Sequence, residues 1–297
     1  MEFRQLEYFK MVAKTKNITK AAKLLHVSQP SITNSIKNLE ANLGVELLDR
    51  TKKYIDLTAE GEVFLKRVEV ILKNIEDAKQ EMKDFNNLSR GKLNIGIPPM
   101  IGTFLFPRIF TEFKKLYPNI DLNLSEEGSL LTREKIENQE LDVGIIILSI
   151  CNDHLEIIPM IESEILVCLN KNHKLSNKDS ISFDEIKNEP VILLKEGFFH
   201  RKKIMQLYKE ESIEPNILLS SNQLETIKSL VKQDVAISFL LKEIVNDENV
   251  VKIPLENRVK VKIGVAWNKE RYISNAAKAF LDFCRDYNIQ SNYKIKN

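Results

Sequence analysis

Several features are scarce in this chain of 297 residues, and their scarcity narrows the class of protein. No apolar run approaches the roughly 18 residues of a membrane-spanning helix, since the nearest, residues 143–151, is too short. The N-terminal MEFRQLEYFK lacks an apolar signal core, so we expect no secretory route. Nine glycines and nine prolines exclude collagen-like and glycine-rich linker architectures. Three cysteines, far apart, fit a reducing cytoplasm and no disulfide framework: Cys151, Cys168 and Cys284.

Charge is distributed unevenly along a chain that is nearly neutral overall. The net charge is +2, but residues 1–58 hold 10 Lys and Arg against 6 Asp and Glu. A basic head on a near-neutral body predicts that the head meets a polyanion. Apolar residues make up 43% and charged residues 29%, which is a globular composition, and the length predicts two or three compact units.

The first sixty residues carry the capping and spacing signals of three short helices. An apolar stripe predicts the first helix between residues 2 and 15. Thr19 is predicted to cap a second helix over residues 20–25, and Ser28 to cap a third with Pro30 in its first turn. Because only two residues lie between the second helix and the cap of the third, these helices must cross steeply, as in helix-turn-helix units. Gly44 ends the third helix, which is expected to bury Ile32, Ile36, Leu39 and Leu43.

Two further elements are predicted before residue 88. The segment ELLDRTKKYIDLT alternates around a basic tip, which indicates a small two-stranded ribbon, or wing. From residue 59 to 85, apolar residues recur every 3.5 positions for three heptads. Such a stripe is usually the packing face of a long core helix, but charged flanks leave only a narrow seam here, which favours a partner helix. We therefore expect dimerisation through Phe64, Val68, Ile71, Ile75, Ala78, Met82 and Phe85.

Beyond residue 88 the pattern changes to alternating strands and helices. The apolar segments LNIGI, IDLNLSE, DVGIIIL, ILVCL, PVILL, NILLS, VAISFL and VKIGVAW predict strands. The first helix of this part is expected over residues 102–116 and the last over residues 275–287. Alternation at this spacing predicts two α/β lobes with mostly parallel sheets. Such sheets place ligands at the carboxyl ends of their strands.

The third helix carries the strongest chemical signal. Its apolar face turns small polar side chains toward solvent, and Gln or Asn amides can contact adenine edges while hydroxyls and Lys serve phosphates. Any surface helix has a polar face, but small donors in the first two turns after a tight turn are typical of a helix that enters the major groove. The predicted DNA contacts are Thr19, Ser28, Gln29, Pro30, Ser31, Thr33, Asn34, Lys37 and Arg50, with Lys52 and Lys53 at the wing tip.

At these residues the chain resembles a known family. The order Ala21-Ala22-x-x-Leu25-x-x-Ser28-Gln29-Pro30-Ser31, continued by Leu43-Gly44-x-x-Leu47-Leu48-x-Arg50 and Leu57-Thr58-x-x-Gly61, resembles the DNA-binding segment of LysR-type transcriptional regulators. The resemblance covers the whole chain and implies an α/β protein with three parts. These are a winged helix-turn-helix DNA-binding domain (1–58), a linker helix for dimerisation (59–88) and an effector-binding domain (89–297) of two lobes that resemble a periplasmic solute-binding fold.

The resemblance also implies partners and lobe boundaries. Family members form dimers, usually assembled into tetramers, bind interrupted palindromes in double-stranded DNA, and switch with a small effector. RNA polymerase is a further partner that the resemblance allows, and no cofactor, metal or membrane is implied. Lobe I is expected over 91–162 and 268–297, and lobe II over 163–267. The segments PPMIG and EEGS resemble the subgroup that regulates acetate or acetoin metabolism and murein-hydrolase export genes.

Some positions depart from the family pattern. Asn34 stands where Arg is common, which puts the base preference in doubt, and Leu48 stands where Phe is common. The usual Gly-x-Gly turn of the late αβ unit reads Gln233-Asp234-Val235, so this turn must take another form.

By the same resemblance, an effector lies between the lobes. Ser129 falls where relatives hold an effector carboxylate, at a helix N-terminus that favours an anion. Met100 replaces a common Ser or Thr and suggests an apolar wall. His200 can charge and meet an acid, although an ordinary surface histidine is an equal alternative. The expected lining is Pro99, Met100, Ile101, Thr103, Ser129, Phe198, Phe199, His200 and Asn222.

Catalytic and metal sites are not indicated. The four histidines show no ligand spacing to cysteines or carboxylates, and no phosphate-binding glycine loop or GxSxG occurs. Cys168 and His173 lack an orienting partner, so we predict that Cys168 is a packing residue. The alternative to a regulator is a cytoplasmic small-molecule-binding protein or enzyme whose first 60 residues form an interaction module.

Overall fold

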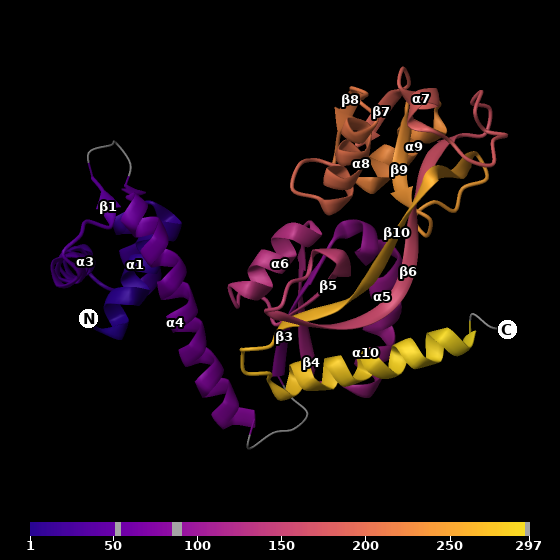
Figure 1. Ribbon diagram of the computed structural model, residues 1–297. Coiled ribbons are helices and arrows are strands. Elements are labelled where there is room, and N and C mark those ends of the chain that lie inside the picture. Colours follow the sequence, from indigo (N-terminus) through magenta and orange to yellow (C-terminus); the bar gives the residue numbers. More distant parts are fainter. Residues whose placement is uncertain (51–54, 85–90, 295–297) are drawn as a thin grey trace. The chain divides into compact units, whose positions relative to one another are not determined.

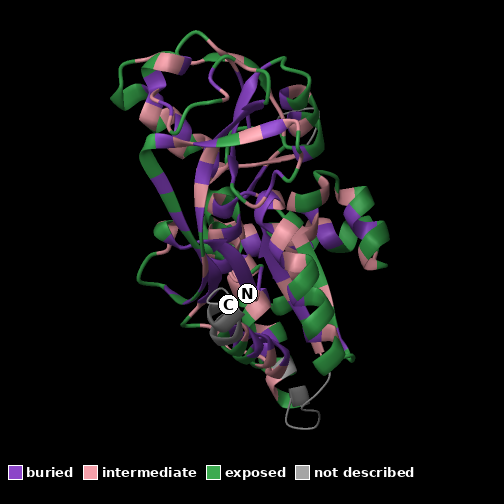
Figure 2. Cartoon of the chain, turned by 90° about the vertical axis from the view of Figure 1, so that its right-hand side faces the viewer, coloured by how far each residue is buried: buried purple, intermediate pink, exposed green. Residues whose placement is uncertain are grey.

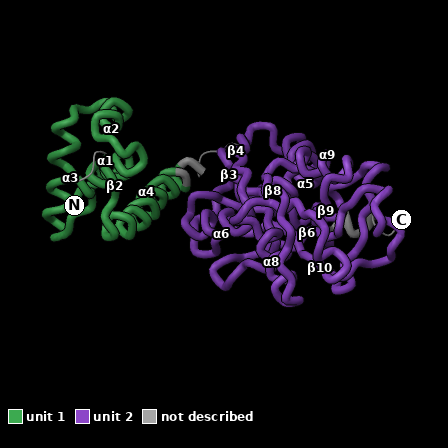
Figure 3. The backbone as a smooth tube through the Cα atoms, turned by 90° about the horizontal axis from the view of Figure 1, so that it is seen from above, with its two compact units in different colours: residues 1–86 green, residues 87–297 purple. Residues whose placement is uncertain are grey.

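The computed structural model describes residues 1–50, 55–84 and 91–294 (Figure 1). The chain forms two compact units, residues 1–86 and 87–297, which Figure 3 distinguishes by colour. Within the described residues, no helix combines the length and apolar character that crossing a membrane requires.

The first unit is a helical head followed by a long helix. Its elements are α1 (Phe3–Thr15), α2 (Ile18–Leu25), α3 (Gln29–Leu43), β1 (Leu48–Asp49), β2 (Asp56–Leu57) and α4 (Ala59–Asp84). The three short helices pack around a core that includes Phe9, Ile32 and Ile36, all fully buried. The two-residue strands pair antiparallel, with Leu48 opposite Leu57, and form the expected wing. Lys52 and Lys53 lie outside the described residues.

The caps of α2 and α3 follow local side-chain chemistry. The side chain of Asn17, not Thr19, caps α2 by accepting a 2.9 Å hydrogen bond from the backbone of Lys20, so the expected cap was wrong. Asn17 precedes the first helical residue, and Thr19 lies within the helix. The Ser28 hydroxyl caps α3 as predicted, accepting from the backbone N–H of Ser31 at 3.3 Å. Gly44 ends α3 in the left-handed conformation.

The seam of α4 divides into two parts. Near the head, Val68 is fully buried in the head core, and the ring of Phe64 packs 5.6 Å from that of Phe9. Farther along, Ile71, Ala78 and Met82 are exposed and Ile75 is half-buried. The head thus covers the first turns of the seam, and the distal turns are open to a partner. Phe85 lies outside the described residues.

The second unit contains one eight-stranded sheet in the order β4-β3-β5-β10-β6-β9-β7-β8. One lobe holds β3 (Gly91–Ile97), α5 (Pro99–Leu116), β4 (Ile120–Glu126), α6 (Ser129–Glu137), β5 (Val143–Ile147) and a 3-10 turn (Leu148–Ile150). The other holds α7 (Phe183–Ile186), β7 (Pro190–Leu193), α8 (Phe199–Glu210), β8 (Asn216–Ser220), α9 (Leu224–Lys232) and β9 (Ile237–Leu241). The elements β6 (Leu155–Asn170) and β10 (Val250–Asn268) join the lobes, and α10 (Asn275–Lys294) follows.

The two joining strands correct the expected topology. The short segments ILVCL and VKIGVAW are the ends of much longer strands, and β6 and β10 pair antiparallel along most of their length. The sheet is therefore parallel within each lobe but antiparallel where the lobes meet. Opposite charges face each other across this pair, as with Lys262 and Glu162 at 3.8 Å. Pro159 is accommodated where the register shifts next to Gly264.

Buried residues concentrate in the strands of the sheet (Figure 2). Helix α10 returns to the first lobe, where the rings of Phe113 and Phe280 meet edge to face at 5.2 Å. Helix α5 begins at Pro99, three residues earlier than predicted, which brings its N-terminus close to the end of β3.

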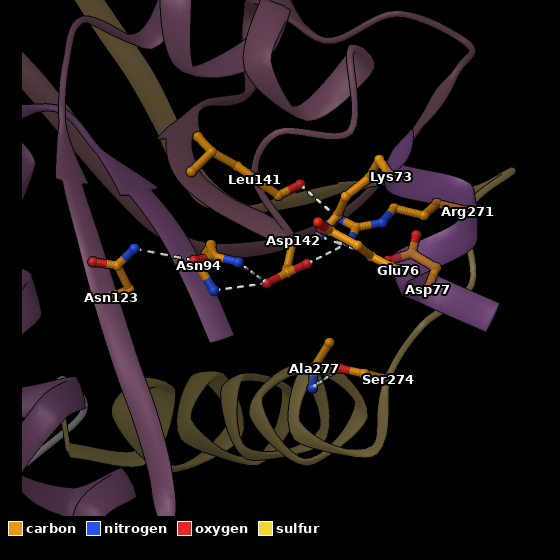
Figure 4. A network of polar contacts seen from close by, with 10 residues as sticks. All are labelled: Lys73, Glu76, Asp77, Asn94, Asn123, Leu141, Asp142, Arg271, Ser274 and Ala277. Atoms are coloured by element: carbon orange, nitrogen blue, oxygen red, sulfur yellow. Dashed lines mark hydrogen bonds and ion pairs between the residues drawn. The ribbon is translucent and has the colours of Figure 1, made fainter. Parts of the chain in front are cut away.

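A polar network ties the end of β10 back to the first lobe (Figure 4). The carboxylate of Asp142 accepts hydrogen bonds from the backbone and side chain of Asn94 at 2.7 and 2.9 Å. Arg271 pairs with the other carboxylate oxygen at 2.7 Å, and Asn123 donates to the amide oxygen of Asn94. The network therefore joins β3, β4 and the segments that flank β5 and β10.

The turn after α9, whose sequence departs from the family pattern, has Asp234 where glycine is usual. Asp234 has φ of 58°, and the N–H groups of Asp234 and Val235 donate back to the carbonyls of Val231 and Leu230. Asp adopts this left-handed conformation more easily than most residues because its short side chain can bond locally. The helix thus ends by the same left-handed geometry that glycine usually provides, so the expectation that this turn takes another form was wrong.

Candidate functional site

The first half of α3 presents polar side chains to solvent. Because Ile32, Ile36 and Leu39 face the core, the opposite face is exposed. The Ser28 hydroxyl caps the helix, and the hydroxyl of Thr33 donates to the carbonyl of Gln29 at 3.0 Å, so both already have a partner within the helix. The exposed residues of this surface are Gln29, Pro30, Ser31, Asn34 and Lys37, and Thr33 is half-buried. Thr19 is exposed on α2.

Glu40 connects α3 to the wing, a role that the sequence analysis did not identify. One carboxylate oxygen accepts from the backbone N–H groups of Leu47 and Leu48 at 3.0 and 3.2 Å. The other accepts from the guanidinium of Arg50 at 2.7 Å. Arg50, predicted as a DNA contact, is thereby held beside α3. The short distance in sequence between Glu40 and the wing could have suggested this pairing. A Glu on a helix, however, is usually interpreted as an exposed residue without such contacts.

Leu43 departs from its expected burial. It is the last residue of α3 and lies exposed, because the core ends with Leu39 one turn earlier.

A second feature is a small cavity between the two lobes. Its volume is about 20 Å³, room for about one water molecule. The first lobe contributes Met100, whose sulfur accepts from the backbone N–H of Leu241 in the second lobe at 3.4 Å. The walls are mostly apolar, with one hydroxyl and one imidazole. The lining residues are Pro98, Met100, Ile101, Ser129, Ile147, Leu194, Phe198, Phe199, His200 and Leu241.

Ser129 is the hydroxyl of this cavity and the first residue of α6. It is buried, and its oxygen accepts from the backbone N–H of Ile147 at 3.5 Å, which leaves the hydroxyl proton available to donate. The N-cap residue Gly128 provides no side chain to occupy the first N–H groups of the helix. Within the part of the chain that the structure describes, this end of α6 therefore combines uncapped N–H donors with the positive end of the helix dipole.

His200 is the imidazole of the cavity. Its exposed fraction is 5%, so the surface alternative is wrong, because α8 turns this residue inward beside Leu241. Neither ring nitrogen makes a hydrogen bond of ordinary geometry to the described residues. Burial lowers the pKa of His200 to about 4, and the nearby backbone of Phe239 offsets this only in part. The ring is therefore neutral near pH 7 and becomes harder to keep buried as pH falls.

The lobes approach each other closely beside this cavity. A Cβ atom placed on Gly128 in the first lobe would lie 2.6 Å from the carbonyl oxygen of Gly197 in the second. That distance is shorter than any real Cβ contact, so only glycine fits at position 128 in this arrangement. Gly197 itself has φ of 89°, which favours glycine. The cleft is closed around its small cavity.

The structure brings together six of the nine residues expected in the effector site. Pro99 lies beside the cavity, while its neighbour Pro98 forms part of the wall. Thr103 is exposed one turn farther along α5, and its hydroxyl donates to the carbonyl of Pro99 at 2.8 Å. Asn222 is exposed and accepts from the backbone N–H of Lys195 at 3.3 Å. Sequence reasoning missed Ile147, Leu194 and Leu241, since apolar strand ends look like any other core residue.

Other chemistry finds little support. Among the described residues, no cluster of three or more His, Cys, Asp or Glu side chains is placed to hold a metal ion. Cys168 is fully buried, and burial raises the pKa of its thiol to about 12, so it stays protonated near neutral pH. His173 instead lies 3.3 Å from Glu189. Packing thus accounts for Cys168.

Two protein families match the chain in succession. Residues 3–62 match the bacterial regulatory helix-turn-helix proteins of the lysR family. Residues 86–288 match the LysR substrate binding domain. Together the matches cover the exposed end of α3 and the cavity between the lobes.

Relatives match along nearly the full length. The HTH-type transcriptional regulator YwbI of Bacillus subtilis is 32% identical over 97% of this chain and 97% of its own. The transcriptional regulator AlsR of the same organism is 29% identical over 81% of this chain and 80% of its own.

Solved structures share the fold. Full-length OxyR from Pseudomonas aeruginosa has a TM-score of 0.70 at 23% identity, covering 97% of this chain and 94% of its own. Full-length CbnR in complex with its target DNA has a TM-score of 0.69 at 24% identity, covering 97% and 100%.

Proposed function

Because the chain belongs to the LysR family of bacterial transcriptional regulators, we propose that it controls transcription in response to a small organic acid bound between its lobes. It is a DNA-binding regulator with an effector-binding domain, and proteins of this kind form oligomers. Its relatives are transcriptional regulators. The identity of the effector and the roles of individual residues are the proposal.

One observation supports an organic acid as the ligand. The imidazole of His200 is buried beside the Ser129 hydroxyl and has no hydrogen-bond partner among the described residues. A buried polar group without a partner costs free energy, so this pair favours a ligand that bonds both. A carboxylate can accept from the hydroxyl, from the first N–H groups of α6 and from a protonated His200. The surrounding Phe, Leu, Ile and Met side chains favour a short apolar body behind the carboxylate.

Ligand entry requires the lobes to separate. The cavity holds about one water molecule, which is less than any carboxylic acid occupies. An acid can shift the lobes only by binding the wider arrangement more tightly than the closed one. In the proposal, this change in the lobes alters how paired heads are presented to DNA.

The head supplies the DNA contacts of the proposal. Gln29, Ser31 and Asn34 are exposed at the start of α3 and would reach base edges, while Lys37 and the wing would meet phosphates. Two heads joined through the distal turns of α4 would read an interrupted palindrome, and two dimers would form a tetramer. RNA polymerase is the partner through which a changed arrangement would act. Because the DNA ligand lies in the cytoplasm of a bacterium, we place the protein there.

The proposal excludes an enzymatic role. The runner-up is a small-molecule-binding protein or enzyme with an N-terminal interaction module, which the two-lobed unit alone would permit. The exposed polar end of α3 and the match of residues 3–62 favour the regulator. Removing residues 1–88 would leave an enzyme active, whereas it would abolish operator binding by a regulator.

The pH dependence of ligand binding tests whether the ligand is a carboxylic acid bound beside His200. A carboxylate beside His200 raises the imidazole pKa above its ligand-free value of about 4, so binding takes up a proton. Affinity should therefore rise as pH falls from about 7.5 to about 5.5, by up to about tenfold per pH unit once the pH lies below the pKa in the complex and above the ligand-free value. Straight-chain carboxylic acids of about two to six carbons should bind, and their amides should not, in calorimetric titrations of the full chain.

Two variants separate His200 from other titrating groups. His200→Gln keeps a polar side chain that does not charge, so its affinity for the acid should be lower and independent of pH. His154→Gln is the control, because His154 is an exposed histidine outside the cavity. Amides that bind as tightly as the acids, or an unchanged pH slope in His200→Gln, would contradict the proposal.

A further inference from the structure

The two lobes are joined by a short stretch in which β6 and β10 run side by side (Figure 1). Strand β5 pairs with β10 over residues 263–266, and β9 pairs with β6 over residues 165–168. Between these two ladders, residues 162–164 of β6 pair with residues 260–262 of β10, and no third described strand pairs with them. We call these six residues the hinge ribbon. Because two strands bend more easily than a wide sheet, a change in the angle between the lobes should concentrate here.

Ser163 is the central β6 residue of the hinge ribbon, and its side chain is buried. Its exposed fraction is 3%, and its hydroxyl donates a hydrogen bond to Oε2 of Glu243. Glu243 follows the end of β9, and its other carboxylate oxygen lies 3.7 Å from Nζ of Lys242. Hydrogen bonds to a charged acceptor are stronger than those between neutral groups, and a buried hydroxyl that loses its acceptor is left unsatisfied. This contact therefore ties the hinge ribbon to the second lobe.

Glu243 is also connected to the cavity between the lobes. Leu241 lines the cavity, and its backbone N–H donates to the sulfur of Met100 in the first lobe. The N–H of Ile244 donates to the carbonyl of Leu241 at 2.9 Å, which closes a tight turn that contains Glu243. A ligand that displaces Leu241 must therefore move Glu243 as well.

The turn is attached to β6 at two neighbouring positions. The backbone N–H of Lys242 donates to the carbonyl of Glu164 at 3.0 Å, and Glu243 accepts from Ser163 one residue farther along. Bending of the hinge ribbon changes the position of Ser163 relative to Glu243, and a hydrogen bond weakens steeply when its distance and angle change. The side-chain contact therefore favours the lobe angle at which it forms, which is that of the closed cleft.

We propose that the hydrogen bond between Ser163 and Glu243 is a latch that holds the lobes closed, and that a ligand entering the cavity releases it through Leu241. The inference rests on the ligand binding of the proposed function and adds the residues that couple the cavity to the hinge ribbon. Neither Ser163 nor Glu243 lines the cavity, so both are positioning residues that act through the lobe angle. Without ligand, the latch sets the fraction of molecules whose lobes are open.

Hydrogen exchange of one backbone amide measures this fraction. The N–H of Leu241 reports on the opening of the lobes, because its acceptor, the sulfur of Met100, belongs to the other lobe. An amide exchanges with solvent when its hydrogen bond opens, and its rate follows the open fraction even when that fraction is small. Mass spectrometry of the full chain, with fragmentation that resolves single amides, gives this rate. No ligand is required, so the measurement does not depend on the acid.

Ser163→Ala should raise the exchange rate of the Leu241 amide about tenfold, because the closed arrangement loses a hydrogen bond to a charged acceptor. Ser238→Ala is the matched control. Ser238 is also a buried serine, but its hydroxyl donates at 2.7 Å to the carbonyl of Ile192, within the second lobe. An equal rate in the two variants would overturn the inference. So would faster exchange throughout the second lobe of Ser163→Ala, since that pattern indicates a general loss of stability.

Two further variants test whether Ser163 and Glu243 act as a pair. Glu243→Gln keeps an acceptor without the charge, so its Leu241 amide should exchange at a rate between those of the unmodified chain and Ser163→Ala. The double variant should exchange no faster than Ser163→Ala alone, because both substitutions remove the same contact. Additive effects would show that the residues act separately and would overturn the latch.

Calorimetric titration with the carboxylic acids of the proposed function completes the test. If the acid binds the wider arrangement, its affinity for Ser163→Ala should rise by the same factor as the exchange rate. Unchanged affinity in a variant whose amide exchanges faster would overturn the link between ligand and latch. If no acid binds any variant, the proposed ligand fails, and the exchange rates still decide whether the latch exists. If acids bind but all exchange rates are equal, the latch fails and the proposed function stands.

Discussion

The proposed function assigns roles to two kinds of polar residue, and their environments are opposite. Gln29 and Asn34 are exposed on a capped helix, so their amides are hydrated and accessible to a macromolecular surface. His200 is buried, and among the described residues neither ring nitrogen has a hydrogen-bond partner of ordinary geometry, so both remain able to bond a ligand. The first arrangement favours a macromolecular surface, and the second favours a ligand small enough to be enclosed.

Asn34 provides the sharpest test of base reading. An amide that contacts adenine bidentately contributes about 1–3 kcal/mol of discrimination, so Asn34→Ala should lower the preference for operator over unrelated duplex by about 5- to 150-fold. Asn42→Ala is the control, because Asn42 is an exposed Asn on the second half of the same helix. Competitive gel-shift titrations at fixed salt measure the ratio. Equal losses in the two variants would place the reading residues elsewhere.

Local chemistry explains which residues could be predicted. Ser28, Pro30 and Gly44 each act on the backbone within four residues, so sequence alone placed both ends of α3. The α2 cap was missed because Asn17 and Thr19 are both good caps, and only the observed helix start distinguishes them. Burial of His200 depends on the turn before α8 and on β9, which are distant in sequence, so its environment could not be predicted.

At the scale of elements, the carboxylate of Glu40 links helix α3 to the wing of the head. Glu40 holds the start of the wing through two backbone N–H groups and Arg50. Its side chain is nearly buried, so these bonds are protected from solvent competition. The wing therefore has a fixed position relative to α3, which a two-residue ladder alone would not provide.

Replacing Glu40 tests this coupling. Glu40→Gln keeps an acceptor for the backbone but loses the charge, so we expect a loss of about 1–3 kcal/mol in the free energy of unfolding of the head. Affinity for all duplexes should fall together, because Arg50 and the wing lose their position rather than a base contact. Glu46→Gln is the control, an exposed Glu in the loop before the wing. A change in base preference without a change in stability would contradict this role.

The full length of the joining strands β6 and β10 could not be predicted from the hydrophobic pattern. Apolar segments predicted one end of β6 and one end of β10, and the charged residues Glu162, Glu164 and Lys260 lie just outside those segments. Lys262 lies 3.8 Å from Glu162 across the strands, and Lys260 is in register with Glu164, so this charged segment is part of the ladder. Pairing partners about a hundred residues apart determine this structure, and a single sequence does not reveal them.

At the scale of the whole second unit, the closed cleft determines how a ligand can act. Met100 and Gly128 in the first lobe approach Leu241 and Gly197 in the second, beside a cavity for about one water molecule. Because β6 and β10 carry the chain between the lobes, small changes at these contacts can change the angle between them. A ligand larger than water can therefore bind only if these contacts between the lobes are broken or lengthened.

We predict that Gly128→Ala separates the two lobes before any ligand binds. Position 128 has an extended backbone that alanine adopts without strain, but its methyl group would lie 2.6 Å from the Gly197 carbonyl, so the loops must part. Since ligand binding also needs the wider arrangement, acid affinity should rise by about fivefold or more, and operator binding without acid should shift toward the acid-bound pattern. Gly102→Ala is the control, because its added methyl meets nothing closer than 3.6 Å. A lower acid affinity in Gly128→Ala, measured by calorimetry, would mean that the ligand closes the lobes further, and the switch would then run in the opposite direction.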